Sequence, residues 1–242
     1  MKEINKAFLL GIFLLIGSYS TLLAQSEKDS IYFLSKGRLF ISPTFSVNNR
    51  IAKNDDQLLR FVEDQYKLEW NVDINVGYFI KDNFSAGAQL SYQSSREDIE
   101  YIADSKELTE KSYGRGITFS PNIRNYFGKG NFKIFNQTNL DFSYGEEIKR
   151  VYKEDDEDKI FSTEINYGIS IQPGLAFFVS ELVAVEASLK LLGWESSYKV
   201  STINDNEDEQ SIVHKNEVNF SVDLLTLHIG IGIYLDQINK HK

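Results

Sequence analysis

The sequence predicts an all-β fold, namely an eight-stranded antiparallel up-and-down barrel that crosses a membrane. Three observations lead to it. Apolar and polar residues alternate in eight separate segments, the connections between segments alternate between short and long, and small uncharged residues dominate the polar face. The 242 residues, 42% of them hydrophobic and 13% aromatic, suit one barrel-sized domain. A mean hydropathy of −0.31 argues against a bundle of membrane helices, each of which needs about 20 consecutive apolar residues.

The first 25 residues are expected to form a secretory signal. Lys2 and Lys6 precede an apolar run at 7–16, and small residues follow up to Ala24 and Gln25. The run is too short to cross a bilayer. We therefore expect a signal at 1–25, a short periplasmic segment at 26–37, the barrel at 38–235 and a periplasmic tail at 236–242. Because the chain has no cysteine, disulfides and cysteine-bound metals are excluded.

Period-two alternation is clearest at residues 66–80. Every second residue from Tyr66 through Trp70 to Ile80 is apolar, and a helical period of 3.6 would scatter these positions. Each alternating segment is long enough to cross a membrane as a tilted strand, which takes about 9–11 residues. The eight expected strands lie at 39–47, 66–80, 84–93, 116–127, 132–144, 163–177, 183–191 and 225–235.

The connections differ in length in a regular way. Strands two and three, four and five, and six and seven are joined by short turn sequences at 81–83, 128–131 and 180–181. The other connections are long and polar. Short turns at one rim and long loops at the other are typical of bacterial outer-membrane barrels, and an even strand count places both termini on the periplasmic side.

A soluble lipocalin-like barrel also alternates, with its apolar face inward. The membrane interpretation is favoured because the polar face is rich in Gly, Ser, Asn and Gln, because the rims are asymmetric, and because aromatic residues gather near strand ends. We expect these aromatic residues to form the girdles found at the two membrane interfaces. They are Phe40, Tyr78, Phe79, Phe84, Tyr126, Phe127, Phe132, Phe177, Phe178, Trp194 and Tyr234.

Three segments, at 120–127 (SPNIRNYF), 171–178 (IQPGLAFF) and 228–235 (HIGIGIYL), resemble the small outer-membrane β-barrel domain family of Gram-negative bacteria, the OmpA/OmpX-like barrels. The signal ending in Leu-Leu-Ala-Gln is similar as well. The resemblance covers about residues 37–235 and implies a surface or envelope protein without catalytic residues. One departure is that the last strand is followed by seven further residues, 236–242, whereas the family usually ends at or near an aromatic residue of that strand.

The charge is concentrated in the long connections. The formal charge of −9 becomes −10 once the signal is removed. The loops at 49–66, 95–112, 145–160 and 196–217 together carry all of this −10, so the wall, turns and tails balance to zero. An acidic chain of this kind is not suited to nucleic acid, which needs a basic surface.

Charged residues on the polar face of the strands are expected to point into the lumen, since lipid-facing charge is costly. They are suited either to a proton or ion path or to a network of ion pairs that fills a lumen with room only for side chains. The candidates are Glu69, Asp73, Arg124, Asp141, Glu164, Glu186, Lys190 and His228.

Two acidic clusters lie in the long connections. Carboxylate clusters can bind calcium, but neither cluster has the glycine of an EF-hand loop, and solvated hairpin tips are the alternative. Strand-like residues flank both clusters, so we expect strands five and six, and seven and eight, to continue as hairpins above the membrane, with edges that can accept a partner strand. The tip residues are Asp155, Asp156, Glu157, Asp158, Asp205, Glu207, Asp208 and Glu209.

The leading functional hypothesis is a non-enzymatic outer-membrane protein with an envelope-structural or surface-binding role. Alternatives are a narrow passage for small solutes and a lipid-modifying enzyme, for which only His214, His228 and His241 could serve as a base. No cofactor motif, metal motif or catalytic residue is predicted. The expected partners are outer-membrane lipid, the barrel assembly machinery and an extracellular protein or surface ligand, and a monomer is expected.

Overall fold

The computed structural model describes residues 34–57, 60–103, 106–153, 156–190, 192–204, 206–220 and 227–236. The expected signal, most of the segment at 26–37, and the tail beyond Asp236 lie outside this described part. In the described part, no helix is long and apolar enough to cross a membrane. The ten strands are β1 (Leu39–Gln57), β2 (Arg60–Lys81), β3 (Phe84–Ala103), β4 (Lys106–Phe127), β5 (Phe132–Lys153), β6 (Asp156–Phe178), β7 (Val183–Ser188), β8 (Leu192–Ile203), β9 (Asn206–Phe220) and β10 (His228–Leu235).

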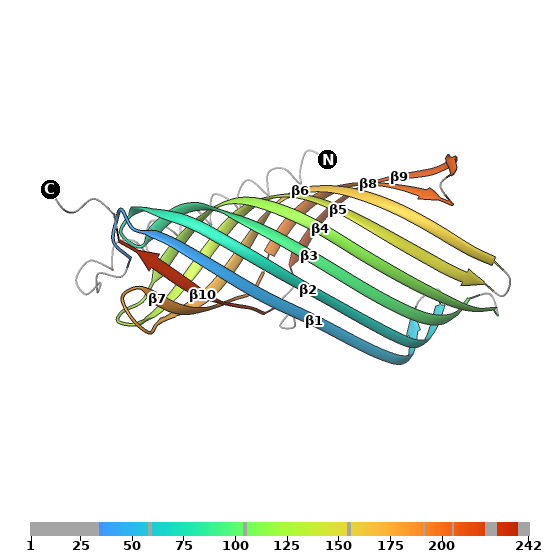
Figure 1. The fold of residues 1–242 in the computed structure, drawn as a ribbon, viewed down its shortest axis with the longest axis horizontal. Helices are drawn as coiled ribbons and strands as arrows, with labels where there is room; N and C mark the ends of the chain where they lie inside the picture. Colours follow the sequence, from blue (N-terminus) through green and yellow to red (C-terminus); the bar gives the residue numbers. More distant parts are fainter. Residues whose placement is uncertain are drawn as a thin grey trace, which may run out of the picture.

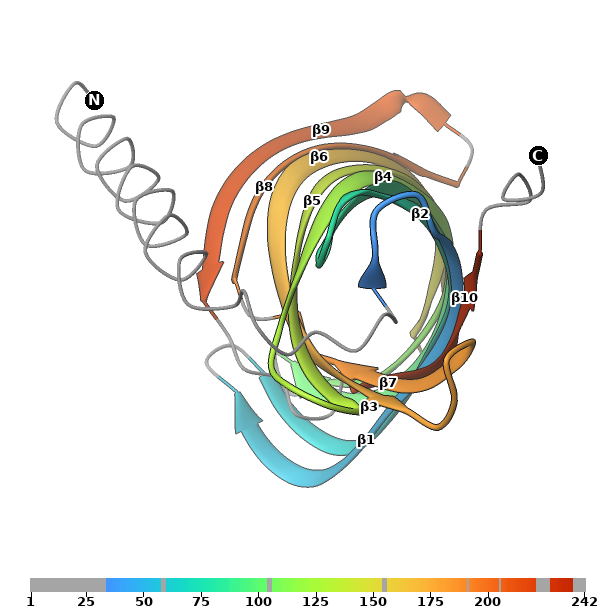
Figure 2. The same cartoon turned by 90° about the vertical axis from the view of Figure 1, so that its left-hand side faces the viewer.

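All strand pairs are antiparallel, and they close into a ring of eight wall positions (Figures 1 and 2). The ring runs β5-β4-β3-β2-β1-β10-β7-β6, and the β5–β6 pairing closes it. β7 and β8 both pair with β6 and form two parts of one wall strand, while β9 pairs with β8 and β10 pairs with β7 and β1. The predicted eight-stranded antiparallel barrel is confirmed.

The periplasmic turns lie where the sequence predicts them. β2 and β3 are joined through Asn83, whose φ of 60° is tolerated by asparagine. β4 and β5 are joined through Gly128 and Gly130, with φ of 110° and 62°. The C-terminal end of the barrel wall lies at this same rim (Figure 1).

The long connections between the first four strands are not loops, which corrects the prediction at 49–66 and 95–112. β1 and β2 stay paired up to Gln57 and Arg60, and β3 and β4 up to Ala103 and Lys106. The expected β5–β6 hairpin is confirmed up to Lys153 and Asp156. Above a membrane both faces of a ribbon meet water, so the apolar alternation that marks a strand disappears although pairing continues.

The last two predicted strands were wrong in their bounds. β7 ends at Ser188 rather than 191, and β10 begins at His228, while 225–226 of the predicted last strand lie outside the described residues. The hairpin expected between the last two strands is present as β8 and β9. Pro173 on β6 has no N–H and accepts a hydrogen bond from the Leu189 N–H at 3.0 Å. The pairing on β6 shifts by one residue between Ser188 and Leu192, so a bulge separates β7 from β8.

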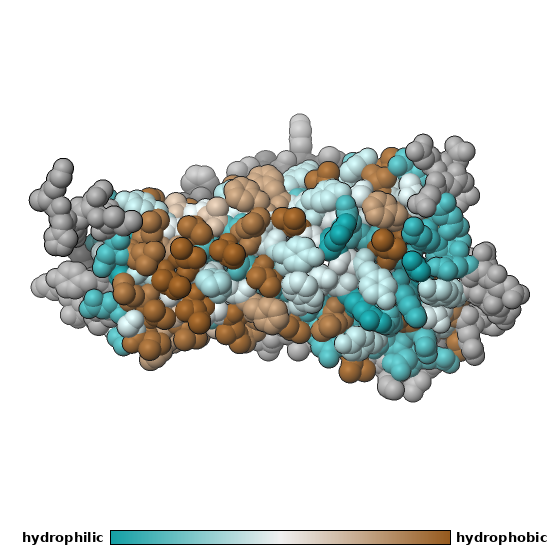
Figure 3. Space-filling view, viewed as in Figure 1, coloured by the Kyte–Doolittle hydropathy of each residue, from teal (hydrophilic) through white to brown (hydrophobic). Residues whose placement is uncertain are grey.

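The outer face of the barrel carries an apolar belt. Ile74 on β2 is 48% exposed and Phe142 on β5 is 54% exposed, although both lie in the middle of the wall. On the face shown in Figure 3, brown apolar residues gather over the half of the barrel near the turns, while the hairpin half is mostly pale or teal with a few brown residues. A soluble barrel would turn this apolar face inward. The orientation is therefore that of a membrane barrel.

Five of the aromatic residues predicted as membrane girdles lie inside the lumen instead. Phe40, Phe79, Tyr126, Phe178 and Tyr234 are at most 2% exposed. These residues lie on the same strand face as the polar residues, so their side chains point into the lumen. The lumen is narrow, and the side chains pack there away from water. Girdle positions are occupied on the outside by Tyr78, Phe132 and Phe177, and by the ring pairs Trp70–Tyr92 and Tyr167–Trp194 toward the hairpins.

Candidate functional site

An aromatic layer closes the periplasmic end of the lumen. Its rings pack with centroids 4.9–6.2 Å apart, which is the usual range for offset and tilted pairs. Gly77 and Gly174 face into this layer, and a Cβ on either would overlap the ring of Phe40 or Phe135. The inward glycines therefore make room for rings. The layer, called the plug below, consists of Phe40, Phe79, Tyr126, Phe135, Phe178 and Tyr234.

A buried ion pair lies directly above the plug. Arg124 Nη1 is 2.9 Å from Glu186 Oε2, and both side chains are at most 5% exposed. Arg124 also donates from Nε to Gln137 Oε1 at 2.8 Å and from Nη1 to the Tyr126 hydroxyl at 3.1 Å. Its guanidinium carbon lies 4.2 Å from the centroid of the Phe135 ring.

The Glu186 carboxylate of this pair also has hydrogen-bond partners besides Arg124. Glu186 accepts hydrogen bonds from Ser42 Oγ at 2.9 Å and from the Tyr234 hydroxyl. A buried ion pair keeps its geometry only when such additional bonds compensate desolvation. The pair therefore joins the plug into one structure, since Tyr126 and Tyr234 belong to both.

A layer of amides follows above the ion pair. Gln137 donates to Gln89 Oε1 at 2.9 Å and to Asn139 Oδ1 at 2.7 Å, and accepts from Asn75 Nδ2 at 2.8 Å. Asn122 donates to Asn75 Oδ1 at 3.1 Å. Aromatic, ionic and amide layers together fill the lumen on the periplasmic side.

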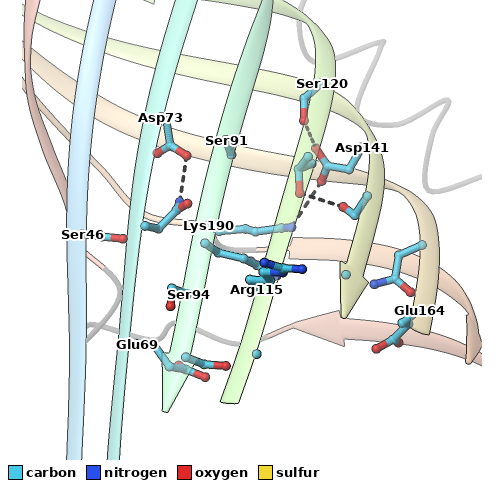
Figure 4. Close-up of a pocket in the computed structure, with 18 of the residues that line it drawn as sticks. Ser46, Glu69, Asp73, Ser91, Ser94, Arg115, Ser120, Asp141, Glu164 and Lys190 are labelled. Atoms are coloured by element: carbon cyan, nitrogen blue, oxygen red, sulfur yellow. Dashed lines mark hydrogen bonds and ion pairs between the residues drawn. The ribbon is translucent and has the colours of Figure 1, made fainter. Parts of the chain in front are cut away.

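Above the amides the lumen widens into a cavity of about 520 Å³ (Figure 4). Its lining reaches from Asp73 and His228 up to Ser162 and Lys199 in the hairpin half of the barrel. Much of the wall is built from serines and from Gly114 and Gly145. Short side chains leave the space that aromatic rings fill below.

Two carboxylates are anchored at the floor of the cavity. Asp73 Oδ2 accepts from Thr44 Oγ1 at 2.8 Å and lies 2.9 Å from His228 Nδ1, while Asn71 donates to Oδ1 at 2.8 Å. His228, one of the lumen candidates, therefore lies beside Asp73 at the cavity floor.

The second anchored carboxylate is Asp141, on the other side of the cavity. It accepts from Ser120 and Ser170, each at 2.7 Å, and pairs with Lys190 Nζ at 3.2 Å (Figure 4).

The eight lumen candidates all point inward, but they form separate groups rather than one network. Arg124 and Glu186 lie in the plug region, Asp73 pairs with His228, and Asp141 pairs with Lys190. Glu69 pairs with Lys67 at 2.7 Å. Glu164 lines the cavity and has no cationic partner within ion-pair distance among the described residues. A continuous charged path through the barrel is therefore not formed, because the plug lies below the groups in the cavity.

Hydropathy does not single out several residues that fill the lumen. Gln137, Asn75 and Phe135 have no charge and do not stand out, and Tyr126 and Tyr234 were assigned to the interfaces. Strand parity was the signal that could have found them, since each shares a face with a charged lumen residue.

The acidic tips are not brought together as a metal site in the described part, where no group of three or more His, Cys, Asp or Glu residues could hold a metal ion. Glu157 lies 3.6 Å from Arg150, and Asp158 accepts from Asn204 at 3.2 Å. Asp156 begins β6. Asp155 and Asp205 lie outside the described residues, as do the side chains of Glu207, Asp208 and Glu209.

The remaining histidines are placed apart from the cavity floor. His214 on β9 packs against the Tyr198 ring at 4.6 Å, and His241 lies outside the described residues. In the described part, His228 is joined to a carboxylate, and no serine or threonine hydroxyl forms a hydrogen bond with it. A nucleophile–base pair is therefore not assembled there.

No family model and no curated protein matches this chain. Among solved structures, it is similar to the outer membrane protein OprG from Pseudomonas aeruginosa, at 11% identity over 86% of this chain and 100% of that one, with a TM-score of 0.45. It is also similar to Ail, the attachment invasion locus protein of Yersinia pestis, at 12% identity over 83% and 99%, with a TM-score of 0.36. The outer membrane protease OmpT from Escherichia coli is similar at 10% identity over 82% and 91%, with a TM-score of 0.37. The fold of this chain is that of the small outer-membrane β-barrels.

Proposed function

We propose that this chain is a non-enzymatic outer-membrane protein that does not conduct solutes and that offers its hairpins and cavity to ligands outside the cell. The closed lumen carries the proposal. Three filled layers separate the cavity from the periplasmic rim, so the molecule has a receptacle open toward the hairpins and no through-passage in the described part.

The direction of the barrel follows from its rims. Short turns lie at one end and long acidic hairpins at the other, and in outer-membrane barrels the longer connections are extracellular. The cavity lies on the hairpin side, so it faces the outside. The assembled surface is acidic and protruding, which supports a surface-binding role over a purely structural one.

Planar-bilayer recording tests the closed lumen. The purified chain is expected to give no stepwise conductance. A variant with Phe40→Ala, Phe178→Ala and Tyr234→Ala removes much of the plug and is expected to give small, brief steps. Stable channels from the unaltered chain would overturn the proposal and favour the narrow passage.

A surface-binding role is tested on cells that display the chain. Shortening the β5–β6 hairpin by removing residues 148–161 leaves the apolar belt and the cavity floor in place. Retention of these cells on arrays of immobilised glycans and proteins is expected to fall relative to the full chain. Equal retention of cells that display the full chain and cells that display the shortened chain would show that the β5–β6 hairpin does not bind the ligand.

The enzyme alternative has its own test. Labelled phospholipid and lipid A are incubated with the chain and with His228→Ala, and no turnover is expected from either. Turnover that is lost in the variant would show an enzyme.

A further inference from the structure

The cavity above the plug is present because many of the side chains that line it are small. The same eight wall positions are filled tightly one layer below, where large side chains are less than one-tenth exposed. In the cavity wall, Ser95, Ser120 and Ser143 stand where rings or amides stand below. The volume of about 520 Å³ lies within the range of small-molecule sites, about 300–1,000 Å³.

The charge of the cavity wall is uneven. Apart from Arg115 and Glu146, which pair with each other at the outer rim, six carboxylates line it, against two lysines and His228. Asp141 and Glu147 have lysine partners, at 3.2 and 2.8 Å. Glu164 and Glu195 have no cationic partner within ion-pair distance among the described residues, so the wall keeps an excess of negative charge.

The hydrogen-bonding groups of the cavity wall also favour a ligand that carries donors. On the β1–β2 wall, Asn48 donates to Glu69 at 3.3 Å and Asn71 donates to Asp73 at 2.8 Å. These bonds fix the two amide groups, and the buried Oδ1 atom of each accepts no hydrogen bond from the described part of the protein. The buried atoms that these two amides leave without a partner are therefore acceptors, and they lie in the same wall as the carboxylates without a cationic partner.

From this pattern, we propose that the cavity binds a small organic cation with several N–H donors, namely a linear aliphatic diamine or polyamine. Each ammonium group offers three donors and a positive charge, which matches carboxylates and amide oxygens together. A bare metal ion is a poorer match, because the carboxylates are spread over the wall and no described group of three could hold one. This proposal of cation binding does not depend on whether the barrel conducts solutes past the plug.

Isothermal titration of the purified full chain in detergent micelles tests the assignment. Putrescine and spermidine are expected to bind saturably. Butanediol, an uncharged analogue of putrescine, and succinate, of similar length and opposite charge, are expected not to bind. Magnesium chloride at matched ionic strength serves as the metal arm. Equal binding of the diol, or tighter binding of magnesium, would overturn the proposal.

A pair of matched variants locates the site. Glu69→Gln with Glu164→Gln removes two charges from the cavity wall and is expected to weaken spermidine binding by at least about tenfold, as when a charged partner of a desolvated contact is lost. Glu157→Gln with Glu63→Gln removes the same charge from the hairpins and is expected to leave binding unchanged. Equal weakening of spermidine binding by both pairs of substitutions would show that the affinity depends only on the net charge of the protein.

A second variant keeps the test decisive if the first does not fold. Ser143→Phe fills space in the cavity and removes no charge. It is expected to abolish saturable spermidine binding while the protein retains the heat-dependent gel mobility of a folded barrel. Undiminished binding by this folded variant would place the amine outside the cavity and overturn the proposal.

Discussion

The two halves of the lumen are built from the same strands and have opposite contents. The periplasmic half places aromatic rings, an arginine and amides on inward positions, and these side chains exclude space. The hairpin half places serines, glycines and carboxylates on the same inward parity, and a cavity remains. From β1 to β6 the backbone pairing continues from one half into the other, so on this side of the barrel the size of the inward side chains determines whether the interior is filled or open.

The two halves also differ in how their ion pairs are held. Arg124 and Glu186 are almost fully buried, and four hydrogen-bond partners, Ser42, Tyr126, Gln137 and Tyr234, surround them. Lys190, whose side chain is half exposed, reaches Asp141 from the cavity. Similar charge pairs should therefore contribute very differently to stability, and the predictions below test that difference.

The largest effect is expected from the buried pair. Arg124→Met leaves Glu186 as an uncompensated buried charge, and loss of one partner of such a pair costs about 3–5 kcal/mol. The measurement is urea unfolding in detergent micelles, followed by tryptophan fluorescence. Lys190→Met in the cavity is the matched control and should cost about 1 kcal/mol or less. Equal costs would contradict the contrast between the two halves.

A smaller but clear effect is expected from the inward glycines. Gly77→Ala places a Cβ against the Phe40 ring, and overpacking of this kind costs about 1–3 kcal/mol. Gly145→Ala in the cavity wall meets only a carbonyl oxygen at 3.6 Å, an ordinary contact, and should change the unfolding midpoint little. Combining Gly77→Ala with Phe40→Leu should recover part of the loss, and no recovery would show that the ring is not the cause.

Much of this contrast was visible in the sequence, and some was not. Alternation gave the wall strands and turns because one face of each strand meets lipid and the other does not. The same criterion failed at 49–66 and 95–112, where both faces meet water and pairing continues without a hydropathy signal. The assignment of aromatic residues near strand ends to the membrane interfaces failed at Phe79 and Tyr234, because it ignored their parity, which places them on the lumen face.

The candidate site shows the same limit. Charge and parity sufficed to place Asp73, Asp141 and His228 in the lumen. Charge and parity could not distinguish the plug from the cavity. That distinction depends on which inward residues of neighbouring strands lie at the same level along the barrel axis. The height of a residue follows from the register between strands, for example Gly77 opposite Phe40, and register is a property of pairing rather than of one strand's pattern.

A third prediction compares the wall with the hairpins. Lys149 Nζ lies 2.7 Å from Glu110 Oε1 across β4 and β5, above the apolar belt; the Lys149 side chain is 34% exposed and that of Glu110 is 10% exposed. Because solvent reaches the lysine end of this pair, Lys149→Ala should lower the free energy of unfolding by only about 1 kcal/mol, measured by urea unfolding. A cost as large as that of Arg124→Met would show that the hairpins, rather than the plug, hold the barrel together.

The smallest effect is expected from pH acting on the outer rim. Glu146 follows Tyr144 just above the belt, and a hydrogen bond from Arg115, together with one from the Tyr144 hydroxyl, holds the pKa of its carboxyl below the ordinary 4.5. A lowered folded-state pKa gives stability that is complete above the unfolded pKa and is lost as pH falls through the folded value. The difference in urea midpoint between the unaltered chain and Glu146→Gln should therefore stay constant from neutral pH down to about 5 and shrink only under more acidic conditions. A difference that already changes near neutral pH would mean that a titratable group other than Glu146 responds to the substitution.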